Sequence, residues 1–258
     1  MIDVATLALL ALTALVAGFV DAIAGGGGLL CLPALLLAGL DPIAALATNK
    51  LQGSFGTGAA AFTFWKKGIL QPRQHLVTMA MVFIGAVAGT AAVGYAPKHA
   101  LQVLLPPLLV LIALYFALAP RLSEIERHPR LHADAFRYGI APVIGFYDGI
   151  FGPGTGSFFM LALVTLSGLG IIAATGRTKL FNFTSNVAAL MVFIISGKIL
   201  WALGLMMGLG QLIGAQLGAS LAIRSGAKII RPLLVVVCVG MATKLLLDPT
   251  NPVRALFP

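Results

Sequence analysis

Most of the chain consists of apolar runs of about 20 residues, the length at which a helix crosses a bilayer. These runs cover residues 4–22, 43–65, 75–96, 99–118, 136–151, 180–196, 199–222 and 229–247. Inside a bilayer the backbone must satisfy its own polar groups, and a helix does so within one segment. The pattern therefore predicts an all-α polytopic membrane protein with about eight long transmembrane helices.

Composition excludes an ordinary soluble domain. Hydrophobic residues make up 59% of the chain, charged residues 10%, and the mean hydropathy is +1.01. A soluble domain carries about 25% charged residues. The net charge of +9 comes from bases scattered between apolar segments, as in cytoplasmic loops, so nucleic acid is not an expected partner. Met1-Ile2-Asp3 has no basic stretch, so we expect the first run to be retained as a helix.

Two apolar runs are too short to span a membrane, and each follows a cluster of glycines. Leu29–Leu40 follows Gly25–Gly28, and Ser157–Gly170 follows a Gly-Pro-Gly-Thr-Gly segment that begins at Gly152. Glycine and proline are costly inside a helix. We therefore predict two half-length helices, each after a break; whether they count as membrane crossings is left open.

The two halves of the chain resemble each other. Gly18-Phe19-Val20-Asp21 matches Gly145-Phe146-Tyr147-Asp148, and further along Lys50-Leu51 matches Lys179-Leu180 and Pro107–Val110 matches Pro232–Val235. The matches occur in the same order with nearly constant spacing between the halves. We predict an internal duplication, with residues 1–120 as the first membrane repeat, 121–137 as a polar cytoplasmic loop and 138–258 as the second repeat. Broken helices at matching places in two halves indicate a secondary transporter with its site near the midplane.

The distribution of Lys and Arg favours inverted repeats. If the short elements count as crossings, one side of the membrane receives Lys66, Lys67, Arg73, Arg121, Arg127, Arg130, Arg137, Arg177, Arg224, Lys228 and Arg231. The other side keeps Lys98, Lys198 and Arg254. Because basic residues concentrate on the cytoplasmic side, this count predicts that both termini are periplasmic.

Two polar segments within the apolar runs are the strongest candidates for a binding site. An ionisable residue inside a membrane segment costs roughly 2.5–3.5 kcal/mol on insertion scales and is a functional candidate by default. Lys50 and Lys179 hold equivalent places, which suggests a shared anion site; a lysine that reaches the headgroups is the alternative. The predicted substrate-binding side chains are Lys50, Lys179, Thr48, Asn49, Gln52, Arg177, Thr178, Asn182 and Asn186.

The glycine breaks also favour an anionic ligand. Free N–H groups at Gly27, Gly28, Gly154 and Gly156 would begin the half-helices and attract anions; close helix crossing is the alternative. Asp21 and Asp148 are the acids inside apolar segments. They either accept hydrogen bonds from the glycine turns, carry a coupling proton or pair with a site lysine. Gly85, Gly89, Gly210, Gly214 and Gly218 predict helix-packing faces.

No constellation for catalysis, cofactor binding or metal binding is present in the sequence. His75, His99, His128 and His132 lack metal-ligand spacing, and Cys31 and Cys238 lie in apolar stretches as expected of packing residues. No nucleophile–base pair is recognisable, so we do not expect an enzyme.

The paired motifs resemble those of the TauE/SafE family of sulfite and organosulfonate exporters. Gly18…Asp21-Ala-Ile-Ala-Gly-Gly-Gly-Gly, with Leu32-Pro33 and Ala47–Lys50, is similar to its first repeat, and Gly145…Asp148 through Gly156 to its second. The resemblance implies a bacterial inner-membrane permease for a small anion such as sulfite or sulfoacetate. We expect alternating access between the two broken-helix repeats. An anion channel or a membrane assembly protein is the alternative; proton or sodium coupling, a homodimer and the direction of transport stay open.

Overall fold

The computed structural model describes residues 3–95 and 128–225, and both segments are helical. The first contains α1 (Val4–Ala24), α2 (Gly27–Leu37), α3 (Pro42–Lys66), the short 3-10 helix η1 (Pro72–His75) and α4 (Leu76–Tyr95). The second contains α6 (Ala133–Ala135), the π-helical turn η2 (Phe136–Ile140), α7 (Ala141–Ile150), α8 (Thr155–Thr165), α9 (Ile171–Ser196) and α10 (Trp201–Ser225). No strand occurs in these two segments.

The predicted apolar runs in the described segments are helices, with one boundary wrong. The run predicted at 180–196 begins earlier, at Ile171. The polar residues from Arg177 to Lys179 were expected to open this helix, but they lie well inside α9, and two of them are buried. The runs at 99–118 and 229–247 lie outside the described residues. So do Cys238, His99, the matches at Pro107 and Pro232, residues 121–127 of the predicted loop, and the bases Lys98, Arg121, Arg127, Lys228, Arg231 and Arg254.

Four helices of the described segments are long and apolar enough to cross a membrane: α1, the segment Pro72–Val93, α9 and α10. The 25-residue α3 is also long enough, but it is less apolar because it carries the polar run around Lys50. Large apolar side chains cover the outside of the bundle, as at Val4 (82% exposed) and Ile195 (88% exposed). Polar side chains are instead buried in its centre. This distribution suits a protein whose outer surface meets lipid.

The two half-length helices are present where they were predicted. α2 and α8 each have 11 residues, and each follows a break at glycine. α1 ends at Gly25, whose φ of 82° is left-handed, and Gly154 before α8 has a φ of 81°. Glycine adopts this backbone conformation without the steric cost that other residues incur. Each half therefore contains a long helix, a turn and a short helix in this order.

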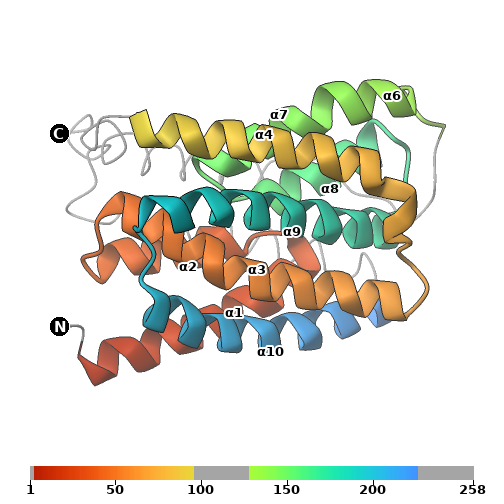
Figure 1. Ribbon diagram of the computed structural model, residues 1–258. Helices are drawn as coiled ribbons and strands as arrows, with labels where there is room; N and C mark the ends of the chain where they lie inside the picture. The colour runs from red at the N-terminus through yellow and green to blue at the C-terminus, as the bar shows by residue number, and fades with distance from the viewer. Residues whose placement is uncertain (1–2, 96–127, 226–258) are drawn as a thin grey trace, which may run out of the picture.

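Equivalent helices of the two halves run in opposite directions. Figure 1 shows that α3 and α9 lie side by side at the centre of the bundle and are antiparallel, since α3 ends where α9 begins. On either side of them, α1 packs against α10 and α4 packs against α7. The polar runs of α3 and α9 thus meet in the middle of the bundle.

The packing faces are built on glycine, as predicted. A Cβ added at Gly214 or Gly218 would meet the backbone carbonyls of Leu15 and Phe19 in α1. A Cβ added at Gly85 or Gly89 would meet those of Pro142 and Phe146 in α7. In the alignment of the two halves, Leu15 and Phe19 correspond to Pro142 and Phe146, and Gly85 and Gly89 correspond to Gly214 and Gly218. The α1–α10 and α4–α7 interfaces therefore use the same positions with the halves exchanged.

Candidate functional site

The two glycine breaks touch each other at the centre of the bundle. A Cβ added at Gly28 would lie 3.2 Å from the Cα of Pro153, and one added at Gly25 would meet the backbone of Gly156 and Ser157. The Ser157 hydroxyl donates a hydrogen bond of 2.7 Å to the carbonyl oxygen of Ala24, across the two halves. Close approach of the two breaks is thus one reason for glycine here.

Each break is held by an aspartate at the end of the preceding long helix. The backbone amide of Gly27 donates to Oδ1 of Asp21 at 3.0 Å. In the second half, the hydroxyl of Thr155 donates to Oδ1 of Asp148 at 2.7 Å. Both carboxylates therefore fix the first turn of a half-helix, which is one of the roles expected for them.

The same carboxylates also pair with the buried lysines, and they do so across the halves. Lys50 Nζ on α3 lies 2.9 Å from Oδ1 of Asp148 on α7. Lys179 Nζ on α9 lies 3.3 Å from Oδ2 of Asp21 on α1 and also donates to the backbone oxygen of Asp21. Each lysine thus contacts the break of the other half, and the four charges balance to zero.

Both lysines are sealed from the surface. Lys50 is 1% exposed and Lys179 is 0% exposed. The alternative of lysines that reach toward the headgroups is therefore wrong. Desolvation of two buried ions costs several kcal/mol each, and only a close partner with further hydrogen bonds compensates for it. Lys179 has such a further hydrogen bond, to the backbone oxygen of Asp21, whereas Lys50 Nζ and Asp148 Oδ2 have no hydrogen-bond partner among the described residues.

A small cavity of about 20 Å³ lies beside the ion pairs, with room for about one water molecule. Its wall combines residues of both halves, from the two breaks and from the facing sides of α3 and α9. The predicted site residues that line it are Asp21, Gly28, Asn49, Lys50, Asp148, Gly154, Asn182 and Asn186. We call this cavity and the two ion pairs the central site.

Other predicted residues support the central site without lining its cavity. Gln52 donates to Asn49 at 2.9 Å, and Lys179 and Gly27 contact Asp21 as described. Gly156 packs on Gly25, and the Thr178 hydroxyl is buried with no hydrogen-bond partner among the described residues. Thr48 instead accepts a hydrogen bond of 3.2 Å from the amide of Leu200.

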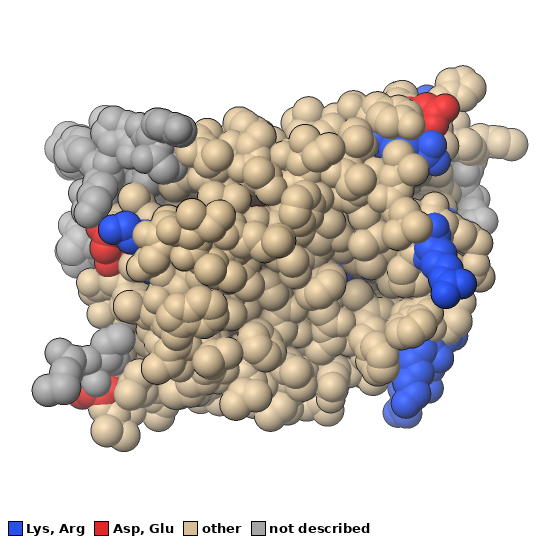
Figure 2. All heavy atoms as spheres, viewed as in Figure 1, with Lys and Arg blue, Asp and Glu red and all other residues tan. Residues whose placement is uncertain are grey.

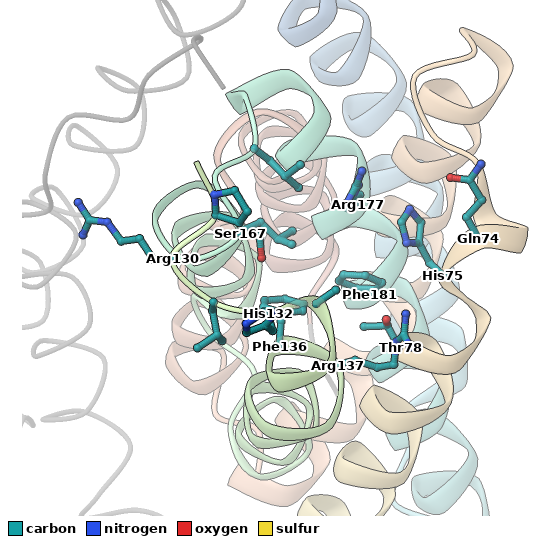
Figure 3. Close-up of a pocket in the computed structure, with 15 residues that line it drawn as sticks. Gln74, His75, Thr78, Arg130, His132, Phe136, Arg137, Ser167, Arg177 and Phe181 are labelled. Atoms are coloured by element: carbon teal, nitrogen blue, oxygen red, sulfur yellow. The ribbon is translucent and has the colours of Figure 1, made fainter. Parts of the chain in front are cut away.

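Arg177 does not belong to the central site. It lines a larger cavity at the end of the bundle where α9 begins, together with His75 and Phe181 (Figure 3). Sequence reasoning grouped Arg177 with Lys179 because they are close neighbours in the chain. On a helix, residues two apart do not face each other.

Five lining residues were not among the predicted site residues, and two of them, Gly25 and Gly152, belong to the predicted glycine breaks. Gly53 and Thr57 correspond to Asn182 and Asn186 in the alignment that pairs Lys50 with Lys179, so the repeat already pointed to them. Gln211 of α10 also lines the cavity, and its Oε1 atom has no hydrogen-bond partner among the described residues. In the sequence, the only indication of a role for Gln211 was that it is a polar residue within a helix face of glycines.

Comparison with known proteins identifies the family of this apolar bundle with its buried polar centre. The model of the family described as sulfite exporter TauE/SafE matches residues 10–245. The chain belongs to the TauE/SafE family. It is 49% identical to the probable membrane transporter protein ORF9 of Sinorhizobium over 248 residues, which are 96% of this chain and 95% of that protein.

Two further relatives carry similar names. The probable membrane transporter protein YfcA of Escherichia coli K12 is 43% identical over 96% of this chain and 92% of its own length. A probable membrane transporter protein of Haemophilus influenzae is 40% identical over 96% of this chain and 97% of its own. No solved structure matches the chain. Membership of this membrane transporter family places the chain in a lipid bilayer as a multi-pass protein that handles a small molecule.

Proposed function

We propose that this protein is a secondary transporter for a small anion, sulfite or an organosulfonate, and that the central site carries the anion. The observation behind this proposal is the crossed arrangement of the ion pairs Lys50–Asp148 and Lys179–Asp21, at the point where two broken helices meet. The description of the family as sulfite exporters supports the choice of substrate class in this proposal.

The geometry suggests how an anion would be held. With both lysines paired, the empty site is neutral and closed around a cavity of about 20 Å³, which is too small for sulfite. Opening must therefore separate the halves on one side. Lys50 and Lys179 then supply charge, the amides of Asn49, Asn182 and Asn186 supply hydrogen bonds, and the half-helix N-termini supply backbone N–H groups.

Charge balance offers a reason for coupling. An anion that takes a lysine from its aspartate leaves Asp21 or Asp148 unpaired in an apolar setting. Such a carboxylate needs a proton or a sodium ion to offset its charge. We therefore propose that the anion moves together with one of these cations, and that the empty site resets with its ion pairs formed.

Alternating access fits an inverted duplication, which we propose for residues 1–120 and 138–258. It is supported by the antiparallel course of α3 and α9 and by the exchanged positions in the α1–α10 and α4–α7 interfaces. We further propose that the end where α3 stops, which carries Lys66, Lys67 and Arg224, faces the cytoplasm. Both termini are then periplasmic, and the membrane is the bacterial inner membrane.

Flux measurements on the purified protein in sealed liposomes test this proposal against its rivals. The substrates are sulfite, sulfoacetate and thiosulfate, with sulfate and acetate as comparison anions. A transporter predicts uptake that saturates with substrate and responds to a proton or sodium gradient. Uptake that rises linearly and ignores both gradients would identify a channel, and no uptake of any of the five anions would favour an assembly role.

A further inference from the structure

A second cavity, much larger than the central one, opens at the end of the bundle that carries most of the described Lys and Arg residues. Its volume is about 550 Å³, within the range of about 300–1,000 Å³ typical of small-molecule sites. It lies between the start of α9, the start of α4 and the segment that leads into η2 (Figure 3). We call it the vestibule.

The wall of the vestibule combines arginine and histidine side chains with apolar ones. Arg137, Arg177, His75 and His132 line it, and no Asp or Glu is among the described residues of its wall. Arg130 also belongs to the wall, but its side chain extends away from the others (Figure 3). Leu163, Leu169 and Phe136 form an apolar surface, and Ser167 and Gln74 add hydrogen-bonding groups. Arginine binds carboxylates and sulfur oxyanions through its planar set of donors.

One neighbouring acid has to be counted. Asp134 lies 2.9 Å from Arg137 Nη1, and its side chain is 75% exposed. This ion pair at the rim offsets part of the positive charge of Arg137, so Arg137 attracts an anion less strongly. Arg177 lies on α9, the helix that also carries the central-site residues Lys179 and Asn182, so we assign the head group of the anion to Arg177.

The duplication does not account for the vestibule. In the alignment that pairs Lys50 with Lys179, Arg177 corresponds to Thr48, His75 to Gly204 and Phe181 to Gln52. These counterparts carry no charge, and Thr48 is tied to the backbone amide of Leu200. The other half thus has no arginine at the position that corresponds to Arg177, which a requirement of the shared fold would not produce.

The vestibule adjoins the central site through α9. Phe181 lines the vestibule, whereas the next residue, Asn182, lines the central cavity. The ring of Phe181 is 1% exposed and packs with Phe159, Phe136 and His75, at centroid distances of 5.6, 6.4 and 5.9 Å. Phe181 therefore belongs to an aromatic cluster in the wall of the vestibule, on the same helix as the lining of the central cavity.

From this arrangement we propose that the vestibule is a second anion site. It holds a small organic anion, a sulfonate or carboxylate on a short carbon chain, with the head group at Arg177 and the carbon chain against the apolar wall. The proposal rests on the proposed function, because it supplies the waiting position from which the same anion reaches, or leaves, the central site.

Charge-selective thiol modification tests the vestibule without any flux measurement. In a background with Cys31→Ala and Cys238→Ala, Ser167→Cys is treated in detergent with the anionic 2-sulfonatoethyl methanethiosulfonate and with its cationic trimethylammonium analogue. The ratio of the modification rates with the anionic and the cationic reagent is independent of the thiol pKa. The same ratio at Ser196→Cys, at the other end of α9, is the reference. We expect the anionic reagent to be favoured by about tenfold or more over that reference, and sulfoacetate to slow the reaction.

Two arginine variants separate a built site from the general field of the basic end. Arg177→Gln should remove most of the preference, whereas Arg224→Gln, at the same end but outside the vestibule, should keep it. Equal ratios at Ser167→Cys and Ser196→Cys, or equal losses in the two arginine variants, would overturn the proposal. Gln74→Cys, on another part of the wall, repeats the measurement if Ser167→Cys folds poorly. Because no transport is measured, failure here and failure of the flux assay are distinguishable.

Discussion

At the scale of single residues, the crossed ion pairs determine which substitutions in the buried core destabilise the protein. All four partners, Lys50, Asp148, Lys179 and Asp21, are at most 3% exposed. Removing one partner leaves its mate buried and charged, at a cost of about 3–5 kcal/mol, whereas replacing both by neutral residues is far less costly. The pairs therefore have to be varied together if function is to be separated from stability.

A thermal unfolding series in detergent checks this coupling. Lys50→Gln and Asp148→Asn should each lower the unfolding temperature strongly, and the double variant should recover most of the loss. Lys179→Gln with Asp21→Asn should give a weaker recovery, because Lys179 also donates a hydrogen bond to the backbone oxygen of Asp21, which the shorter glutamine loses. Lys198→Gln, on the exposed turn before α10, serves as the control. A double variant no more stable than either single one would refute the coupling.

The lysines could be found from the sequence because a charge inside an apolar run is conspicuous. Their partners could not be assigned, since the pairing depends on how the halves are placed in space. Asp21 lies closer in the chain to Lys50 than to Lys179, yet it pairs with Lys179. The location of Arg177 was missed for a related reason, because neighbours in sequence point to different sides of α9.

At the scale of the helices, much of the architecture followed from the sequence. The two half-length helices and their glycine breaks came from run length and glycine clusters, which act locally. The start of α9 did not follow from the sequence, because its first turns contain the charged residues Arg177 and Lys179 and therefore interrupt the apolar run. In the folded chain Lys179 is compensated by Asp21 of the other half, and local reasoning has no access to that partner.

The glycine faces give a prediction at this scale. Gly214→Ala places a Cβ against the carbonyl oxygen of Leu15, so the α1–α10 interface must open. We expect a loss of stability of about 1–3 kcal/mol, as for other overpacked sites. Gly139→Ala is the matched control, since nothing lies within 4 Å of its added Cβ. Unfolding in detergent measures both, and equal stability of the two variants would contradict the packing role.

At the scale of the whole molecule, charge is distributed between two ends with an apolar girdle between them. Figure 2 shows Lys and Arg gathered mainly at the end where α3 stops, and little charge along the side of the bundle. Lys198 lies in the turn between α9 and α10, at the opposite end. The proposal that the basic end faces the cytoplasm applies the positive-inside rule to this distribution.

Labelling of single cysteines in intact cells checks this orientation. In the background without Cys31 and Cys238, a membrane-impermeant maleimide should label Lys198→Cys from outside. It should reach Lys67→Cys only after the cells are opened. The reverse pattern would show that the basic end is periplasmic and that both termini are cytoplasmic.

The central claim is that the anion crosses at the site between the two crossed ion pairs. Sulfite and sulfoacetate flux in liposomes that contain Lys50→Gln/Asp148→Asn tests it most directly, because this variant keeps the charge balance and should stay folded. The account predicts that flux falls by about 10-fold to 100-fold, as expected for loss of a charged contact to the anion, while Lys198→Gln transports normally. Wild-type flux in the folded double variant would contradict the account.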